Sequence, residues 1–138
     1  MQKIILDTNV VVSALIQRSF PYLILMDVYL GRKCQLCISE DLMAEYYTVL
    51  NCDKFSKFPD FKAKANSILV DIENNASFFY PKKKVKIIKD ASDNMLLELA
   101  LECKADILIS GNTNDLTFTR YKRTKIVTPR EYWEYHKP

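Results

Sequence analysis

Residues 3–9 read KIILDTN, a run of aliphatic side chains that stops at Asp7 and is followed by Thr8 and Asn9. A short continuous aliphatic run of this kind is typical of a strand that is buried on both faces of a parallel sheet. A carboxylate so close to a buried strand costs free energy unless something pairs with it. The stretch therefore predicts a central strand over residues 3–7 and, at its carboxyl end, an acid that needs a partner.

Strand-like and helix-like segments alternate along the rest of the chain. Further strands are predicted at residues 34–39, in one or both of the segments 76–81 and 85–89, at 106–110, and at 124–127 as a short edge strand. Helices are predicted at about 21–30, from a Ser39 cap to about 50, at 61–76, from a cap at Asp90 or Ser92 to about 103, and from a Thr128 cap onwards. Such alternation is satisfied most simply by a parallel sheet with helices on both faces. The sequence thus predicts one α/β domain over residues 1–138, with a Rossmann-like three-layer α/β/α fold around a central parallel sheet of four to five strands.

The composition limits the classes of protein to which the chain can belong. Its 138 residues suit one compact domain, and no internal repeat or linker-like tract divides them. No apolar run approaches the ~20 residues of a membrane-spanning helix. No secretory leader is seen, so we expect a cytoplasmic protein with its four cysteines in the reduced state.

Basic residues cluster in two stretches, although the formal net charge is only +3. The stretches are Lys82, Lys83, Lys84, Lys86 and Lys89, and Arg120, Lys122, Arg123 and Lys125. Either they are solvated loops, or they bind a polyanion such as the phosphate backbone of a nucleic acid. The sequence leaves both interpretations open.

Acidic and amide side chains are predicted to gather at one edge of the sheet. In open α/β sheets, ligands bind beyond the carboxyl ends of the strands, where loops and helix amino termini converge. The residues expected there are Asp7 after the first strand, Asp90 and Asp93 at the start of the helix to 103, and Ser110, Asn112 and Asp115 after the strand at 106–110. At about 100° per residue, Glu45 falls on the flank of its helix and is expected to reach the same edge.

Several carboxylates at one edge predict a cation. Neighbouring carboxylates raise one another's pKa, so a site that holds them ionised needs a positive partner. Mg²⁺ and Mn²⁺ prefer oxygen ligands, which suits an acid cluster in a chain with a single histidine. A divalent ion held in this way lowers the pKa of a bound water and stabilises charge on a phosphate. The chemistry predicted is metal-assisted hydrolysis of a phosphodiester.

The same segments resemble a known family. LDTNVVVSAL (6–15), the lone Glu45, DASDNMLLELALECKADILISGN (90–112) and IVTPREYWEY (126–135) occur in the order found in the PIN domain. More narrowly, they resemble the VapC-like toxin components of bacterial toxin–antitoxin systems. The resemblance implies a PIN-like fold, a Mg²⁺- or Mn²⁺-dependent endoribonuclease that leaves 5′-phosphate and 3′-hydroxyl ends, a cognate antitoxin protein and a homodimer.

The resemblance also implies roles for individual residues. Asp7, Glu45 and Asp93 match the family acids that hold the metal, directly or through water. Asn112 stands where the family often has a fourth acid, and Asp115 three residues later restores the charge. Supporting roles fall to Thr8, Asn9, Asp90 and Ser110, of which Thr8 and Asn9 match positions that orient the Asp7 carboxylate or a bound water. The RNA backbone is expected to contact Lys82, Lys83, Lys84, Lys86, Arg120, Lys122 and Arg123.

Plainer interpretations of the acids stay open at this point. Asp7 can simply cap the helix that follows it, and Asp93 can be an anion placed at a helix start. Glu45 can be a solvated helix residue, and Asp115 a turn residue. A domain with Asn112 in place of an acid can also be a PIN scaffold that binds RNA or a protein without cutting.

Overall fold

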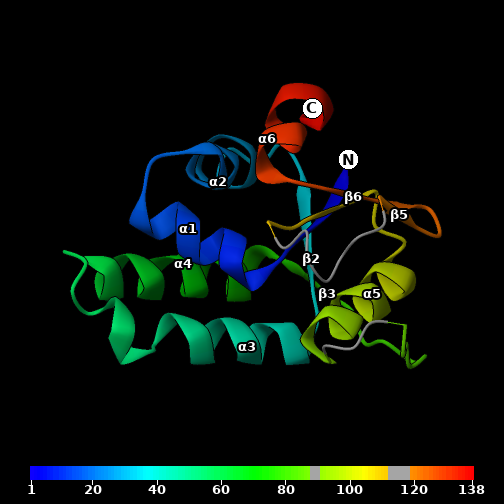
Figure 1. The fold of residues 1–138 in the computed structure, drawn as a ribbon, viewed down its shortest axis with the longest axis horizontal. Coiled ribbons are helices and arrows are strands. Elements are labelled where there is room, and N and C mark those ends of the chain that lie inside the picture. The colour runs from blue at the N-terminus through cyan, green and yellow to red at the C-terminus, as the bar shows by residue number, and fades with distance from the viewer. Residues whose placement is uncertain (88–90, 112–118) are drawn as a thin grey trace.

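The strands form one sheet with β1 at its centre. The computed structural model describes residues 1–87, 91–111 and 119–138, with only the backbone described at Ser92. The strands are β1 (Lys3–Leu6), β2 (Gln35–Ile38), β3 (Ser77–Phe78), β4 (Ile107–Ile109), β5 (Arg120–Tyr121) and β6 (Thr124–Val127). Their order is β3-β2-β1-β4-β6-β5 (Figure 1). All neighbouring pairs are parallel except β5 with β6.

The predicted sheet agrees with this arrangement in its centre and differs at its borders. Five strands run parallel, as expected, and β5 adds a short antiparallel strand beyond them. The prediction that residues 124–127 form an edge strand is wrong, because β5 pairs with the outer side of β6. Of the two segments considered for another strand, the first contains β3, whereas residues 85–87 form no strand. Residues 88 and 89 of that second segment lie outside the described residues.

The helices cover both sides of the sheet. They are α1 (Thr8–Ile16), α2 (Phe20–Leu23), the π-helical η1 (Ile24–Tyr29), α3 (Glu40–Leu50), the 3₁₀ turn η2 (Asp53–Phe55), α4 (Phe61–Asn75), α5 (Ala91–Cys103), α6 (Pro129–Glu131) and the π-helical η3 (Tyr132–His136). In Figure 1, α1, α3 and α4 lie on one side of the sheet and α5 lies on the other, which gives the predicted three-layer α/β/α fold.

Local capping chemistry sets two of the helix starts. Ser39 caps α3, since its Oγ accepts the Leu42 N–H at 3.1 Å. Thr128 caps α6 in a capping box with Glu131, and Pro129 occupies the first turn. Both caps were expected from the sequence. The predicted cap of α5 at Asp90 or Ser92 falls on residues whose side chains lie outside the described part of the chain.

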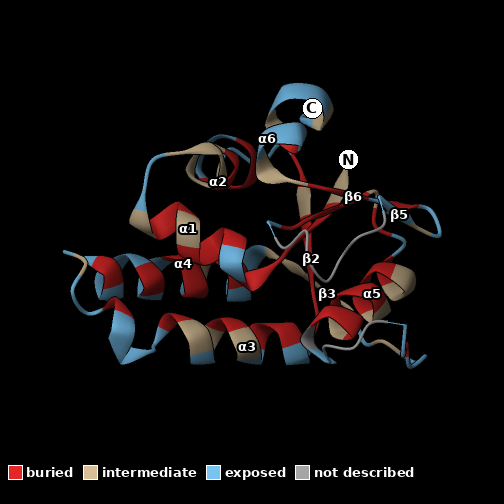
Figure 2. Cartoon of the chain, viewed as in Figure 1, coloured by how far each residue is buried: buried red, intermediate tan, exposed pale blue. Residues whose placement is uncertain are grey.

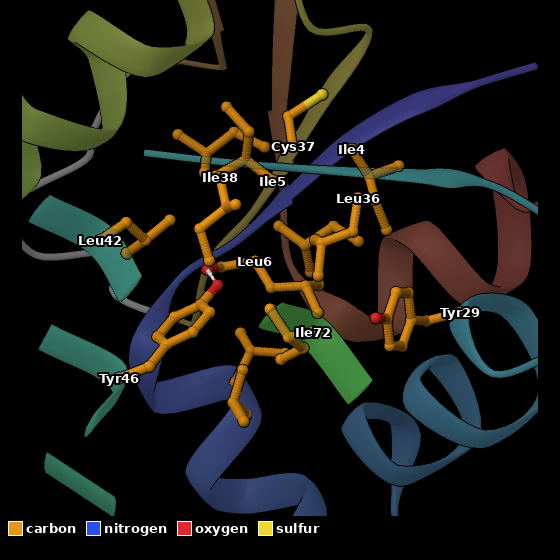
Figure 3. Packing of buried hydrophobic residues seen from close by; sticks show 14 of the residues in the cluster. Ile4, Ile5, Leu6, Tyr29, Leu36, Cys37, Ile38, Leu42, Tyr46 and Ile72 are labelled. Carbon is orange, nitrogen blue, oxygen red and sulfur yellow. Dashed lines mark hydrogen bonds between the residues drawn. The ribbon is translucent and has the colours of Figure 1, made fainter. Parts of the chain in front are cut away.

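The core is built around β1. Ile4, Ile5 and Leu6 are each fully buried, as expected for a strand covered on both faces. Figure 2 shows buried residues along the strands and on the helix faces that meet them. Figure 3 shows Tyr46 and Leu42 of α3 packed beside the end of β1. Each such side chain contributes about 1.5–3 kcal/mol of burial free energy.

No single helix among the described residues is long and apolar enough to cross a membrane. Residues Thr8–Ile16 and Phe20–Tyr29 pass such a test only when they are taken together, and the two are bent by 98° at their junction.

Gly31 lies in a turn that leaves no room for a side chain. A Cβ atom built at this position would lie 2.1 Å from the carbonyl oxygen of Asp27, which is a backbone atom. We expect Gly31→Ala to lower the free energy of unfolding by about 1–3 kcal/mol, because the backbone must shift to relieve the overlap. Urea unfolding followed by circular dichroism measures the change.

Gly111 provides the matched control. Among the described residues, a Cβ atom at Gly111 would meet nothing within 4 Å. Gly111→Ala should therefore change the free energy of unfolding by no more than about 0.5 kcal/mol. Equal stability losses in the two variants would contradict the steric explanation for Gly31.

Candidate active site

Asp7 is held at the carboxyl end of β1 by the strand next to it. Leu6 pairs with Ile109 in the β1–β4 register, and the Asp7 N–H continues the ladder by donating to the Ile109 carbonyl at 3.0 Å. This register places Ser110, the first residue after β4, beside Asp7. The Ser110 hydroxyl donates a hydrogen bond to Asp7 Oδ2 at 2.7 Å. The structure therefore brings Asp7 and Ser110 together at the edge where the sequence predicts them.

The Asp7 carboxylate is buried, and its surroundings disfavour its charge. Only 7% of the residue is exposed. Burial raises the pKa of Asp7, the hydrogen bond from Ser110 opposes this shift, and the negative charge of Glu45 raises the pKa further. The nearby backbone N–H groups of Asn9 and Thr8 act in the same direction as Ser110. A buried acid beside a second acid is the arrangement that a bound cation would stabilise.

Helix capping does not account for Asp7. The residue occupies the N-cap position of α1 with an extended backbone, but its side chain makes no capping hydrogen bond. Its described hydrogen bond goes instead to Ser110, which is 103 residues away in the chain. Ser110, across the sheet edge, is therefore the main hydrogen-bond partner of the carboxylate, and the backbone N–H groups of Asn9 and Thr8 at the start of α1 contribute less.

Glu45 reaches the same edge from α3. The side chain is half-buried, and its Oε2 accepts a short hydrogen bond from the Thr8 hydroxyl. This contact does not fit the interpretation of Glu45 as a solvated helix residue. It joins the Glu45 carboxylate to Thr8, the residue that follows Asp7 in the chain. Thr8 was expected to orient the Asp7 carboxylate or a bound water; its backbone N–H acts on Asp7, and its hydroxyl donates to Glu45. The side chain of Asn9 is exposed.

Tyr46 fixes α3 against the end of β1. It is fully buried, and its hydroxyl donates to the Leu6 carbonyl at 2.5 Å (Figure 3). Burial raises the pKa of Tyr46 well above its usual value, and the charges of Asp7 and Glu45 raise it further. From the sequence, Tyr46 is one residue of a buried stripe. Nothing in the sequence indicates that its hydroxyl bonds to the residue before Asp7.

Asp93 lies in the first turn of α5 and is buried, with 5% of the residue exposed. Helix α5 packs against α3 and β2. Within residues 1–87, 91–111 and 119–138, no three His, Cys, Asp or Glu side chains are grouped closely enough to form a metal site. Asp90, Asn112 and Asp115 lie outside the described residues. The structure thus brings Glu45 near Asp7 but does not group Asp93 with both of them, and the ligand roles of Asp7, Glu45 and Asp93 stay predictions.

The two basic stretches lie in different places. Lys82, Lys83, Lys84 and Lys86 are exposed in the segment that leads to α5. Arg123 instead forms an ion pair with Asp106 at 3.1 Å, and Asp106 directly precedes β4. The amino end of β4 is the edge opposite Ser110, so Arg123 and its neighbour Lys122 lie away from Asp7. Their contact with RNA stays a prediction, as does that of Arg120.

The Thr8–Glu45 hydrogen bond joins α1 to α3 and should be measurable. We expect the double-mutant cycle of Thr8→Val and Glu45→Ala to give a coupling of about 1–2 kcal/mol in the free energy of unfolding, because the alanine side chain has no acceptor and hydrogen bonds to charged groups are stronger than neutral ones. Thr124 is a buried threonine whose hydroxyl donates to Ala105, away from Glu45. Thr124→Val combined with Glu45→Ala should give no coupling. Equal coupling in both cycles would contradict the contact.

Comparison with known proteins identifies the family. A model of the PIN domain matches residues 3–114, a range that includes Asp7, Glu45 and Asp93. The chain belongs to the PIN domain family. No curated protein matches this PIN domain in sequence. The predicted resemblance to the PIN domain is thus confirmed.

The fold of this PIN domain is similar to that of a solved structure. The match is to a chain in the crystal structure of VapBC2 from Rickettsia felis bound to a DNA fragment from their promoter. The TM-score is 0.59 at 17% sequence identity, and the match covers 92% of this chain and 98% of the other. At this identity the similarity shows a shared fold.

Proposed function

We propose that this PIN domain is a VapC-like toxin that hydrolyses RNA phosphodiester bonds with the help of Mg²⁺ or Mn²⁺. The observation that carries the proposal is the state of Asp7. Its carboxylate is buried at the carboxyl end of the central strand, is held by Ser110, and lies within the electrostatic influence of Glu45. Such a carboxylate stays ionised most readily when it binds a cation.

The donor atoms at this edge fit a hard divalent ion. Asp7 and Glu45 offer carboxylate oxygens, and Thr8 and Ser110 offer hydroxyl oxygens; one hydrogen bond pairs Thr8 with Glu45, and another pairs Ser110 with Asp7. Oxygen donors favour Mg²⁺ and Mn²⁺ over softer metals. Asp7 and Glu45 would hold the ion directly, Asp93 would hold it through water, and Asn112 or Asp115 would complete the site. When bound, the ion would lower the pKa of a water and stabilise charge on the phosphate.

The protein's own residues set the geometry of the reaction. Ser110 holds the Asp7 carboxylate in one orientation, and Thr8 does the same for Glu45. The Tyr46 hydroxyl donates to the Leu6 carbonyl and so fixes α3 against the end of β1. This contact keeps Glu45 of α3 at a fixed separation from Asp7, the residue that follows β1. Lysines 82, 83, 84 and 86 would hold the RNA backbone, which predicts binding that weakens with salt.

A protein partner follows by analogy with the similar structure, which is a VapBC2 assembly bound to a DNA fragment from their promoter. We propose that this chain likewise acts with a cognate antitoxin protein. A homodimer in the cytoplasm is the arrangement that the family resemblance implies. Size-exclusion chromatography with light scattering tests the homodimer directly.

Cleavage of RNA by the purified full chain tests the function. Single-stranded and structured RNAs are incubated with Mg²⁺ or Mn²⁺, and parallel reactions contain EDTA. We expect cleavage only with metal, and products with 5′-phosphate and 3′-hydroxyl ends. Cleavage that continues in EDTA would contradict the proposal.

The second candidate function is a scaffold that binds RNA without cutting it. Asn112, which brings no charge to a position where the family often has an acid, favours this candidate. Binding of RNA that does not depend on metal, together with no cleavage of any RNA tested, would support the scaffold over the nuclease.

A further inference from the structure

Residues 82–87 form a strap along α5, and we refer to them as the lysine strap. Three of its backbone N–H groups donate hydrogen bonds to side chains of the helix. The pairs are Lys82 with Glu102 Oε1 at 3.2 Å, Val85 with Glu98 Oε2 at 3.0 Å, and Ile87 with Asn94 Oδ1 at 3.2 Å. In Figure 1 the segment between β3 and α5 runs beside the helix.

The three acceptors form one stripe on the helix. Asn94, Glu98 and Glu102 are spaced four residues apart, and side chains at this spacing lie on the same face. At 1.5 Å per residue the acceptors repeat about every 6 Å along the helix axis. The strap meets them in reverse order, so it runs antiparallel to α5. Its last bond is to Asn94, the residue after Asp93, so the strap ends at the turn that carries that acid.

Of the three strap residues that donate to α5, only Val85 is buried, whereas Lys82 and Ile87 are exposed. Val85 is 7% exposed and packs into the core. The lysines before and after it, Lys82, Lys83, Lys84 and Lys86, are exposed. Because the backbone is held against α5 at three points, the exposed lysines extend from backbone positions that are fixed along the helix. A run of lysines in an unattached loop would have no such order.

Glu98 and Glu102 have a role that their charge alone would not suggest. Both are half-buried, and their carboxylates are used by strap N–H groups. On simple electrostatic grounds, acids beside a lysine cluster weaken the binding of a polyanion. Here the same acids hold the cluster in place, so their removal has two opposite effects that an experiment can separate.

We propose that the lysine strap is a track for the phosphate backbone of single-stranded RNA, and that Glu98 and Glu102 are positioning residues that hold this track. The inference rests on the proposed function for the identity of its ligand. Tyr80 precedes the strap and is 63% exposed, so its ring is available to stack on an unpaired base. The track leads toward the first turn of α5 and so delivers RNA to the edge that contains Asp93.

Binding measured without cleavage tests the track. The probe is a fluorescently labelled 20-nucleotide uridine RNA in buffer with EDTA, and anisotropy gives the dissociation constant at several salt concentrations. The double variant Lys83→Gln and Lys84→Gln should bind at least about tenfold more weakly. The slope of its log affinity against log salt concentration should be shallower than that of the wild type by roughly 1.4, because each lost phosphate contact with a single strand changes the slope by about 0.7. An unchanged salt dependence would overturn the track.

Substitutions of the acids test the positioning role. Glu98→Ala and Glu102→Ala each make the protein more positive, yet each should weaken RNA binding by about three- to tenfold because the strap loses an anchor. Glu98→Gln removes the same charge but keeps an oxygen that accepts the Val85 N–H, so it should bind at least as tightly as the wild type. Glu73→Ala is the matched control for charge and should not weaken binding, because Glu73 is exposed on α4, on the other side of the sheet from α5 (Figure 1).

Two results would overturn the positioning role. One is binding by Glu98→Ala that equals or exceeds that of the wild type, and the other is equal weakening in Glu98→Gln. Circular dichroism verifies that each variant is folded, and the lysine and Gln variants keep the test valid if an Ala variant does not fold. If the wild type binds RNA through the strap but cleaves none with Mn²⁺, the nuclease proposal fails and the track stands. If the wild type cleaves RNA and the strap variants have an unchanged KM, the track fails and the nuclease stands.

Discussion

Asp7→Asn is expected to lower the rate of RNA cleavage by at least about 100-fold, because removal of one group that stabilises transition-state charge typically costs 10²–10³ in rate. The substitution removes the carboxylate charge and keeps the shape of the side chain. An asparagine oxygen can still accept the hydrogen bond from the Ser110 hydroxyl, so the local geometry should survive. Initial rates on a labelled RNA with saturating Mn²⁺ give the comparison.

The same substitution should make the metal-free protein more stable at neutral pH. Burial raises the pKa of Asp7 above its ordinary value of 3.8, so between 3.8 and the raised value the folded state binds more protons than the unfolded state. The free energy of unfolding therefore falls as the pH rises through this range, and the loss is complete above the folded pKa. Asp7→Asn removes this loss and should therefore raise the free energy of unfolding of the metal-free protein at pH 7. The gain should vanish below pH 3.8.

Metal binding gives a readout that does not depend on cleavage. Mn²⁺ at 100 times its dissociation constant should add about 2.7 kcal/mol to the free energy of unfolding of the wild type. In Asp7→Asn this gain should be much smaller at the same concentration. Cleavage that persists in Asp7→Asn would contradict the catalytic assignment. Equal stabilisation of both proteins by Mn²⁺ would contradict the role of Asp7 in holding the ion.

Tyr46→Ala is expected to lower the free energy of unfolding by about 3–5 kcal/mol, the range for loss of a buried large aromatic ring. Tyr46 is fully buried between α3 and the end of β1, so the cavity cannot fill with solvent from the surface (Figure 3). Total stabilities of small domains are about 5–15 kcal/mol, so this one change is expected to remove a large part of the total. Urea unfolding gives the measurement.

Tyr46→Phe separates the hydroxyl from the ring. It should cost about 1–2 kcal/mol, since the Leu6 carbonyl loses a buried donor while the packing stays intact. Because Leu6 precedes Asp7, we also expect kcat for RNA cleavage to fall several-fold with KM unchanged. A Phe variant as stable as the wild type would show that the hydrogen bond to Leu6 contributes nothing, and a loss as large as that of Tyr46→Ala would contradict the packing argument.

Local chemistry explains what could be predicted of this fold from the sequence. The aliphatic run before Asp7, the Ser39 and Thr128 caps and the periodicity of residues 61–76 depend on neighbours within a few positions, so each is visible in the chain itself. The sequence predicts the neighbourhood of β1 and β4 less directly. Once both strands are assigned to one parallel sheet, however, their carboxyl ends must share an edge, and this places Asp7 near Ser110.

Contacts between distant residues explain what could not be predicted. Three features depend on how the elements pack, and no local pattern in the sequence encodes them. They are the pairing of β5 outside β6, the position of Arg123 at the sheet edge opposite Asp7, and the strap along α5. The roles of Thr8 and Tyr46 are of the same kind, because their hydrogen bonds span 37 and 40 residues.

The sequence by itself determined that an acid follows a buried central strand and that the chain adopts an α/β fold. Both conclusions depend on hydrophobic periodicity and helix capping, which involve residues close together in the sequence. Only the tertiary structure decided which groups surround that acid. Ser110 and Glu45 act on Asp7 through space after the chain has folded, and burial, which raises the pKa of Asp7, is itself a property of the packed molecule.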